Sequence, residues 1–198
     1  MRLLLIRHAE TASNVAGVID TGIPGHGLTA VGQQQAHNLV ATLAGERVET
    51  IYVSSQVRTA LTATPLASSR SLPIVVLDGL REITAGSLEM KGDTNSTDSY
   101  LATVHSWIGG ALSVRMPGGE DGHEFLHRYD SAVTEIFDSG CRVAAVFSHG
   151  CAIRAWAAIR TRNVDPVLDL DHDLDNTEVT VLEGSPTNWF LKSKTSTG

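Results

Sequence analysis

The sequence predicts an α/β fold, a three-layer α/β/α sandwich with a mostly parallel central sheet. Strand-like apolar segments alternate with segments of helical periodicity along the 198 residues, which is the pattern of a sheet covered by helices. Residues 3–6 and 142–147 are nearly unbroken apolar runs, as expected of strands buried on both faces. The length suits one domain, 1–198, with an insertion at about 84–119.

Six short segments are predicted to be strands, because each is rich in apolar or β-branched residues and is bounded by turn residues. They are residues 3–6, 50–53, 73–77, 142–147, 178–183 and 189–192. The final residues, 193–198, are expected to fray.

Four helices are predicted between these strands from apolar residues at helical spacing. Thr29 is expected to cap the first, and Gly45 to end it. The second starts near Gln56, and Pro65 is expected to kink or restart it because proline lacks an amide donor. The other two cover residues 119–138 and 151–159.

Two irregular segments are expected to cover a site. Residues 15–27 contain several glycines and a proline and predict a loop. Residues 84–119 have a weak pattern dominated by Gly, Ser, Thr and Asn, with one helix expected over 100–112. A connection of this length favours a functional role.

Composition and charge exclude several classes of protein. The chain is 42% hydrophobic and 19% charged, with a net charge of −7, so nucleic acid is not an expected partner. Cys141 and Cys151 are too few for a disulfide framework, which favours the cytoplasm. No apolar run matches a signal peptide or a membrane span, so a membrane is not an expected partner.

Charged and imidazole side chains gather where predicted strands end. Arg7 and His8 follow the first strand, Glu82 comes soon after the third, and His149 lies just beyond residues 142–147. Arg58 lies one turn into the helix that follows another strand. Because open α/β sheets place ligand crevices at the carboxyl ends of their strands, we expect these side chains to converge on one pocket.

The residue types point to a phosphoryl group. Two arginines and two histidines would repel one another unless an anion lay between them, and guanidinium groups bind phosphate oxygens in bidentate fashion. A neutral histidine such as His8 can act as a nucleophile. Glu82 is the candidate acid, because a nearby phosphate raises a carboxyl pKa. Glu10 ranks lower, because its segment already curls into the loop.

These residues resemble the motifs of the histidine phosphatase superfamily, the phosphoglycerate-mutase-like proteins. Arg7-His8-Ala9-Glu10-Thr11 with Asn14 is similar to that family's Arg-His-Gly-Glu-Thr signature. Further similar motifs, in the family's order, are Leu28-Thr29 with Gly32, Ser54-Ser55 with Arg58, Leu80-Arg81-Glu82-Ile83, Pro117-Gly118-Gly119-Glu120 and Ser148-His149-Gly150 with Ile153-Arg154.

The resemblance implies a metal-independent phosphatase that needs no cofactor and acts on a small phosphorylated substrate. His8 would be phosphorylated, and Glu82 would protonate the leaving group and then activate water. The residues that would hold the phosphate are Arg7, Asn14, Arg58 and His149. The resemblance leaves the natural substrate and the oligomeric state open.

Departures from the family pattern leave two alternatives. Ala9 and Met90 stand where the family usually has glycine, so a non-catalytic phospho-ligand binder of the same fold stays open. A phosphoglycerate-mutase-type phosphotransferase is the other alternative. Mutases carry a longer insertion with extra basic residues, whereas residues 84–119 hold only Lys91 and Arg115. This favours the phosphatase and makes Lys91 and Arg115 the expected substrate contacts.

Several other side chains could either contact a ligand or simply belong to the core or the surface. Tyr100, His105 and Trp107 are further candidate substrate contacts, although Trp107 could equally form the core of the insertion. The spacing of His123 and His127 around Glu124 matches a zinc-protease pattern, but no third ligand is evident. The histidines predicted to be surface residues are His26, His37, His105, His123, His127 and His172.

Overall fold

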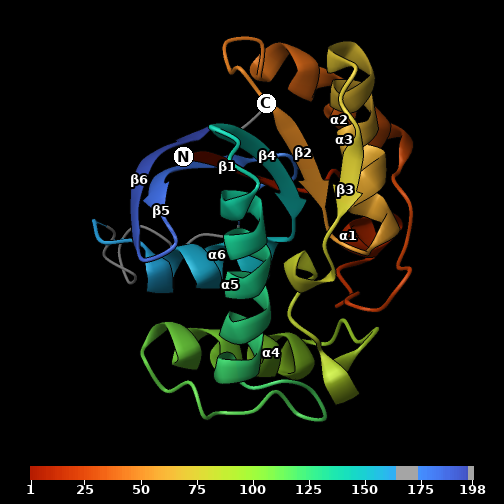
Figure 1. Ribbon diagram of the computed structural model, residues 1–198. Helices are drawn as coiled ribbons and strands as arrows, with labels where there is room; N and C mark the ends of the chain where they lie inside the picture. Colours follow the sequence, from red (N-terminus) through yellow and green to blue (C-terminus); the bar gives the residue numbers. More distant parts are fainter. Residues whose placement is uncertain (164–173, 196–198) are drawn as a thin grey trace.

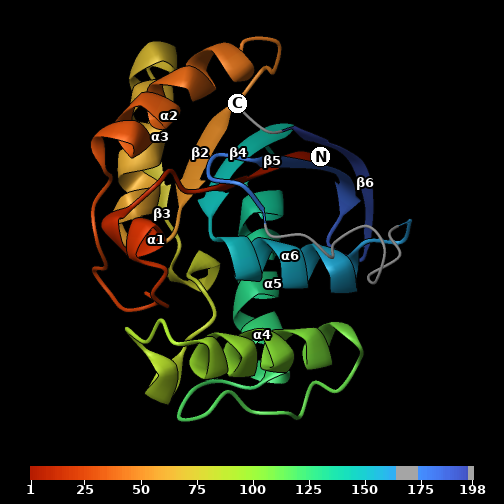
Figure 2. The ribbon, with the colours of Figure 1, turned by 180° about the vertical axis from the view of Figure 1, so that it is seen from behind.

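The computed structural model describes residues 1–163 and 174–195, and it has the expected three layers (Figures 1 and 2). One six-stranded sheet has the order β3-β2-β4-β1-β5-β6. Its strands are β1 (Arg2–Arg7), β2 (Thr50–Val53), β3 (Ile74–Val76), β4 (Val143–Ser148), β5 (Val179–Ser185) and β6 (Asn188–Thr195). All six predicted strands are therefore present.

The centre of the sheet is parallel, as predicted. Strand β1 pairs in parallel with β4, and β2 pairs in parallel with β4 and β3, whereas β5 is antiparallel to β1 and to β6. The register of β1 and β4 aligns Arg7 with Ser148. The residues that follow, His8 and His149, therefore leave the same edge of the sheet next to each other.

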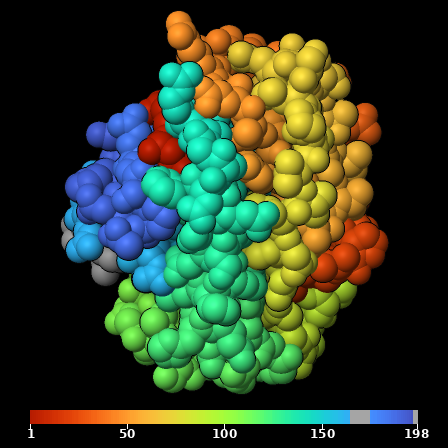
Figure 3. Space-filling view, viewed as in Figure 1, coloured from red at the N-terminus to blue at the C-terminus, as the bar shows by residue number. Residues whose placement is uncertain are grey.

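Six α-helices surround the sheet in the described part of the chain. They are α1 (Ala12–Ala16), α2 (Ala30–Thr42), α3 (Val57–Arg70), α4 (Thr94–Ile108), α5 (Gly122–Asp138) and α6 (Gly150–Arg160), with short 3₁₀ turns η1 (Asp78–Leu80) and η2 (Gly86–Leu88). Helices α2 and α3 lie together on one side, and α4 crosses below α5 and α6 (Figures 1 and 2). In the space-filling view, α5 runs between the C-terminal strands and the region of α2 and α3 (Figure 3).

The apolar run in β1 feeds two hydrophobic cores, one on each face of the sheet. Leu4 and Ile6 belong to the core that contains Leu39 of α2, whereas Leu3 and Leu5 belong to the core formed with α5 and α6. All four β1 side chains are fully buried. Because successive residues of a strand face opposite sides, a strand covered on both faces is apolar throughout.

Three helix predictions need correction. Helix α1 was expected to be loop in part, but Thr11 and Asn14 form a capping box that starts it. Helix α4 begins at Thr94 rather than residue 100, because the Asp93 side chain accepts a hydrogen bond from the amide of Ser96 and caps a polar first turn. Helix α3 continues through Pro65 without a break.

The remaining differences concern element ends. Helix α5 begins at Gly122, three residues later than expected, because Asp121 caps it. Residues 193–195 extend β6 instead of fraying, and residues 196–198 lie outside the described part. Within the described residues, no helix is long and apolar enough to cross a membrane.

Candidate active site

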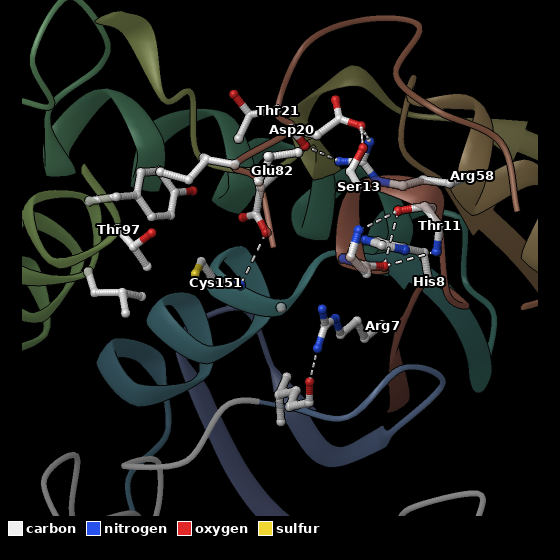
Figure 4. Close-up of a pocket in the computed structure, with 17 residues that line it drawn as sticks. Arg7, His8, Thr11, Ser13, Asp20, Thr21, Arg58, Glu82, Thr97 and Cys151 are labelled. Atoms are coloured by element: carbon white, nitrogen blue, oxygen red, sulfur yellow. Dashed lines mark hydrogen bonds and ion pairs between the residues drawn. The ribbon is translucent and has the colours of Figure 1, made fainter. Parts of the chain in front are cut away.

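A cavity of about 200 Å³ lies at the edge of the sheet where β1 and β4 end. Its lining includes Arg7, His8, Asn14, Asp20, Arg58 and Glu82. Figure 4 shows that Arg7, His8 and Arg58 lie to one side of Glu82, with Thr97 on the other. The structure thus brings together the residues that the sequence placed at strand ends.

His8 is held as a neutral imidazole with one free ring nitrogen. Its amide donates to the carbonyl of Ser148 at 3.0 Å, and its Nδ1 lies 2.8 Å from the carbonyl of Ala9. Because a carbonyl can only accept, Nδ1 carries the proton and Nε2 keeps its lone pair. Burial, together with the charges of Arg58 and Arg7, lowers the pKa of His8 well below its usual value. Nε2 of His8 therefore has the lone pair that a nucleophile requires.

Each of the two arginines has one buried nitrogen without a hydrogen-bond acceptor. Arg58 is 2% exposed, and its Nη2 donates to the carbonyl of Asp20 at 2.8 Å, while Nη1 of Arg7 donates to the carbonyl of Leu174. Nε of Arg7 and Nη1 of Arg58 have no hydrogen-bond acceptor. Unpaired buried donors are costly, and both arginines line the cavity, so their guanidinium groups are candidates to bind an anion there.

His149 lies against Arg58 rather than in the lining of the cavity. It is completely buried, and its ring centroid is 5.2 Å from that of His8. Its Nδ1 accepts from Nε of Arg58 at 3.3 Å, so Nε2 carries the proton and lies 2.7 Å from Oγ of Ser54. Burial, followed by the charge of Arg58, lowers its pKa well below the usual value. In this arrangement His149 orients Arg58.

Glu82 lies at the amino end of α6. Its carboxyl oxygens accept hydrogen bonds from the amides of Ile83 at 2.8 Å, Ala152 at 2.8 Å and Cys151 at 3.2 Å. Burial raises the pKa of this carboxyl, although these amides and Arg58 act in the opposite direction. A raised pKa favours the protonated acid, which is the form that can donate a proton to a leaving group.

The buried ion pair between Glu120 and Arg128 supports the segment that carries Glu82. The carboxylate of Glu120 accepts from Nη2 and Nε of Arg128 at 2.7 and 2.8 Å and from the amide of Thr84 at 2.9 Å. Arg128 also donates to the carbonyls of Arg81 and Glu82. Sequence reasoning noted Glu120 only in a motif and missed Arg128, whose carbonyl partners on Arg81 and Glu82 lie more than 40 residues away.

Asp20 is a second residue that sequence reasoning missed. Its carboxylate accepts from Oγ of Ser13 at 2.6 Å, lies 2.8 Å from Nδ1 of His26, and is 3.7 Å from Nη1 of Arg58. Burial opposes ionisation of Asp20, but these partners outweigh it and lower the pKa. Asp20 fixes Arg58, yet it stands in a glycine-rich loop that offers no pattern from which to predict that role.

The two irregular segments do cover the cavity, and they are joined to each other. The carboxylate of Glu89 accepts from the amide of Thr21 at 2.8 Å and from its hydroxyl at 2.5 Å. The amide of Ile19 donates to the carbonyl of Lys91 at 2.9 Å. Ile19 and Thr21 line the cavity on one side and Thr97 on another.

The structure does not place Lys91 or Arg115 among the lining residues. Arg115 is instead bound at the surface to Asp121 at 2.7 Å and Glu124 at 2.8 Å. Its guanidinium group already has two carboxylate partners, so the expectation that it contacts substrate is corrected. The contact of Lys91 with a lining residue is made by its backbone carbonyl, which accepts a hydrogen bond from the amide of Ile19.

The other candidate contacts also differ in position. Tyr100 lines the cavity, but its hydroxyl donates to the carbonyl of Ile83 at 2.8 Å. Trp107 is fully buried and stacks on Phe125, so it belongs to the hydrophobic core, as its structural interpretation predicted. His105 is exposed and pairs with Arg154 at 3.1 Å.

The departures at Ala9 and Met90 have different consequences. Ala9 is fully buried and has ordinary negative-φ backbone, so its methyl group is accommodated without strain. Met90 has φ of +57°, a left-handed conformation that favours glycine. Glu10 lies outside the cavity, where its carboxylate accepts from the hydroxyl of Thr29 at 2.6 Å.

The remaining histidine predictions can be compared with the structure. His26, His37, His123 and His127 are exposed, as expected, and His172 lies outside the described residues. Within residues 1–163 and 174–195, no group of three or more His, Cys, Asp and Glu side chains is arranged to hold a metal ion.

Comparisons with known proteins identify relatives of this chain. A probable phosphoglycerate mutase of Escherichia coli is 34% identical over 179 residues, covering 82% of this chain and 80% of that protein. The PE-PGRS family protein PE_PGRS11 of Mycobacterium tuberculosis is 34% identical across 95% of this chain, which spans only 35% of that protein's length.

Structural similarity extends over the whole chain. The crystal structure of an α-ribazole phosphatase from Shigella flexneri superposes with a TM-score of 0.77 at 24% identity, covering 100% of this chain and 97% of that one. The family model of the histidine phosphatase superfamily (branch 1) matches residues 3–197. With the fold, the site and this match in agreement, the chain belongs to the histidine phosphatase superfamily, branch 1.

Proposed function

We propose that this protein is a metal-independent phosphatase that hydrolyses a phosphomonoester through a phosphohistidine at His8. The observation that carries the proposal is the position of a neutral imidazole beside two guanidinium groups with unpaired buried donors. Glu82, a carboxyl with a raised pKa, lines the same cavity. Nucleophile, anion site and acid are the three parts that phosphoryl transfer requires.

The first half of the reaction forms the phosphoenzyme. Nε2 of His8 attacks phosphorus, and the bond between phosphorus and the ester oxygen breaks as Glu82 donates its proton to that oxygen. Arg7 and Arg58 stabilise the charge on the transferring oxygens. As His8 becomes positively charged, the hydrogen bond from Nδ1 to the carbonyl of Ala9 strengthens.

The second half returns the enzyme to its starting state. Glu82, now a carboxylate, accepts a proton from a water molecule whose oxygen attacks phosphorus. The bond between phosphorus and Nε2 of His8 breaks, and inorganic phosphate leaves. Glu82 ends protonated and His8 neutral, so each atom and proton is accounted for over one turnover.

The alternatives are a mutase-type phosphotransferase and a non-catalytic binder. A mutase must hold a substrate with a second anionic group, yet the cationic side chains that line the described cavity are Arg7 and Arg58 alone. A binder would need an impaired site, but the strain at Met90 lies in an exposed residue outside the cavity. Both observations favour the phosphatase.

The test is hydrolysis of p-nitrophenyl phosphate with chelator present, compared between wild type and His8→Asn. We expect His8→Asn to lose about 10⁴-fold or more in kcat, because the nucleophile is removed. His123→Asn, an exposed histidine on α5, is the matched control and should retain wild-type turnover. Quenching with alkali during turnover should trap a phosphoprotein in wild type only, and that protein should lose its phosphate in acid, because the N–P bond of phosphohistidine is acid-labile.

Equal turnover by His8→Asn would overturn the proposal. Tight phosphate binding without hydrolysis of p-nitrophenyl phosphate or any metabolite monophosphate would support the binder instead. Phosphoryl transfer to an added alcohol in preference to water would support the phosphotransferase. A small phosphorylated molecule as partner and the cytoplasm as compartment remain predictions.

A further inference from the structure

The catalytic cavity has two chemically different ends. Arg7, His8 and Arg58 form the inner end, where the phosphoryl group would bind. The outer end is lined by Val18, Ile19 and Leu101, whereas the carbonyl of Leu174 accepts from Arg7 at the inner end. The apolar side chains of the outer end come from the loop after α1 and from α4. The leaving alcohol of a bound phosphomonoester would extend past Glu82 toward Thr97 of α4, which lies on the other side of Glu82 from Arg58 (Figure 4).

The cationic charge of the cavity is confined to its inner end. In the described part of the chain, Arg7 and Arg58 are the only lysine or arginine side chains in the lining, and the charged side chains that join them are the carboxyls of Asp20 and Glu82. Residues 164–173 contain four aspartates and neither lysine nor arginine. Two guanidinium groups, of which Arg58 already has the carboxylate of Asp20 at 3.7 Å, carry at most the charge needed for one phosphate dianion and leave no cation for a second anion.

The polar groups of the outer end do not compensate for that lack. The hydroxyl of Tyr100 already donates to the carbonyl of Ile83, and burial raises its pKa well above the usual value, so it stays uncharged. The hydroxyl of Thr97 is left to interact with a ligand. A carboxylate or second phosphate placed there would lose its hydration without gaining an ionic partner, which is unfavourable.

We propose that the natural substrate is the monophosphate of an uncharged, partly apolar alcohol, and that the transferred phosphate is its only anionic group. This inference rests on the proposed phosphatase function. The cavity volume of about 200 Å³ is below the roughly 300–1,000 Å³ of pockets that enclose drug-sized ligands. The enclosed part of the alcohol is therefore compact.

Two esters of nearly equal size test the inference, 4-methylphenyl phosphate and 4-carboxyphenyl phosphate. We expect kcat/KM to be at least about tenfold higher for the methyl compound, because the carboxylate would be left without a partner. The carboxyphenolate is the better leaving group, so chemical reactivity alone would give the opposite order. Equal kcat/KM values, or a higher value for the carboxyphenyl ester, would overturn the inference.

A variant pair locates the discrimination at the outer end. Leu101→Arg adds a cation on α4 and should shift the ratio of the two kcat/KM values about tenfold or more toward the carboxyphenyl ester. Leu101→Met, which keeps an apolar side chain of similar size, should keep the wild-type ratio. An unchanged ratio in a folded Leu101→Arg protein, checked by circular dichroism, would contradict this location.

The controls separate this inference from the function on which it rests. If p-nitrophenyl phosphate and both test esters all resist hydrolysis, the phosphatase function fails and the substrate class fails with it. If all three are hydrolysed in a His8-dependent manner without discrimination against the carboxylate, only the substrate class fails. If Leu101→Arg does not fold, the ratio of kcat/KM for the two test esters with the wild-type protein decides whether the inferred substrate class is correct.

Discussion

The inner and outer ends of the cavity are held by different parts of the fold. The inner end follows the parallel strands β1 and β4, whose register fixes His8 beside His149. The outer end comes from α4 and the loop after α1, which are joined through Glu89 and Thr21. Hydrogen bonds of the sheet hold His8 and His149 in position. Side-chain contacts between the two irregular segments shape the outer end of the cavity.

Substitutions at the outer end can change specificity without loss of catalysis. A shift at the inner end would move a strand that is bonded on both sides and buried on both faces. A substitution at Leu101 changes one partly buried side chain of the insertion. Substrate preference can therefore vary at the outer end while the phosphoryl-transfer residues stay in place.

The largest effect is expected at the inner end from Arg58→Ala. Loss of an arginine that stabilises phosphoryl transfer lowers kcat by about 10³–10⁵-fold, and this change also removes the hydrogen-bond donor to Nδ1 of His149. Steady-state kinetics with p-nitrophenyl phosphate provide the measurement, and Arg142→Ala, whose side chain is 84% exposed, is the control. A loss below tenfold would show that the inner end does not work as described.

Glu82→Gln should separate two classes of substrate. For an alkyl phosphate, whose leaving group needs a proton, we expect kcat to fall about 10²–10⁴-fold. With p-nitrophenyl phosphate, whose leaving group needs none, the variant should release about one equivalent of nitrophenol rapidly and then turn over slowly. Stopped-flow measurement of that burst is the readout. Equal losses in the rapid phase for both esters would argue against Glu82 as the acid.

The pH dependence follows from the two shifted groups. Glu82 must be protonated, and burial raises its pKa, so kcat for an alkyl phosphate should fall as the pH rises through that raised value. His8 must be neutral, and its pKa is lowered well below 6.5, so activity should persist below pH 6.5. A pH profile with an optimum on the alkaline side would contradict these assignments. In Glu82→Gln the descending limb should disappear.

Arg128→Met tests the support behind Glu82. Removing one partner of a buried ion pair leaves the other charge uncompensated and costs about 3–5 kcal/mol of stability. In this variant the carboxylate of Glu120 stays buried without its cationic partner. Chemical denaturation measures this loss, and Arg142→Met, at the surface, should have a far smaller effect. If Arg128 also positions Glu82, kcat for an alkyl phosphate should fall more than kcat for p-nitrophenyl phosphate.

Met90→Gly should have the smallest effect. Glycine relieves a left-handed backbone that costs other residues roughly 1–2 kcal/mol, but it also makes the unfolded chain more flexible. The net change in unfolding free energy should lie within about 1 kcal/mol, and kcat should be unchanged because Met90 lies outside the cavity. A large change in kcat would mean that the backbone conformation at Met90 affects the positions of the side chains at the inner end.

The sequence by itself determined the three-layer fold and most of the inner end. Residues 3–6 are apolar without interruption because β1 is covered on both faces, and that run ends at the arginine and histidine that enter the cavity. A local pattern of this kind, an apolar run followed by charged residues, can be recognised in the sequence without knowledge of the fold. Local patterns also predicted all six strands, but not the polar first turn of α4.

Only the tertiary structure decided which side chains meet across long distances. Asp20 and Arg128 act through partners brought near by folding, and Arg115 is drawn away from the cavity by Asp121 and Glu124. No local pattern encodes such pairings, because hydrogen bonds and ion pairs depend on the positions of both partners. The residue types therefore indicated the chemistry, whereas packing decided which of them reach the substrate.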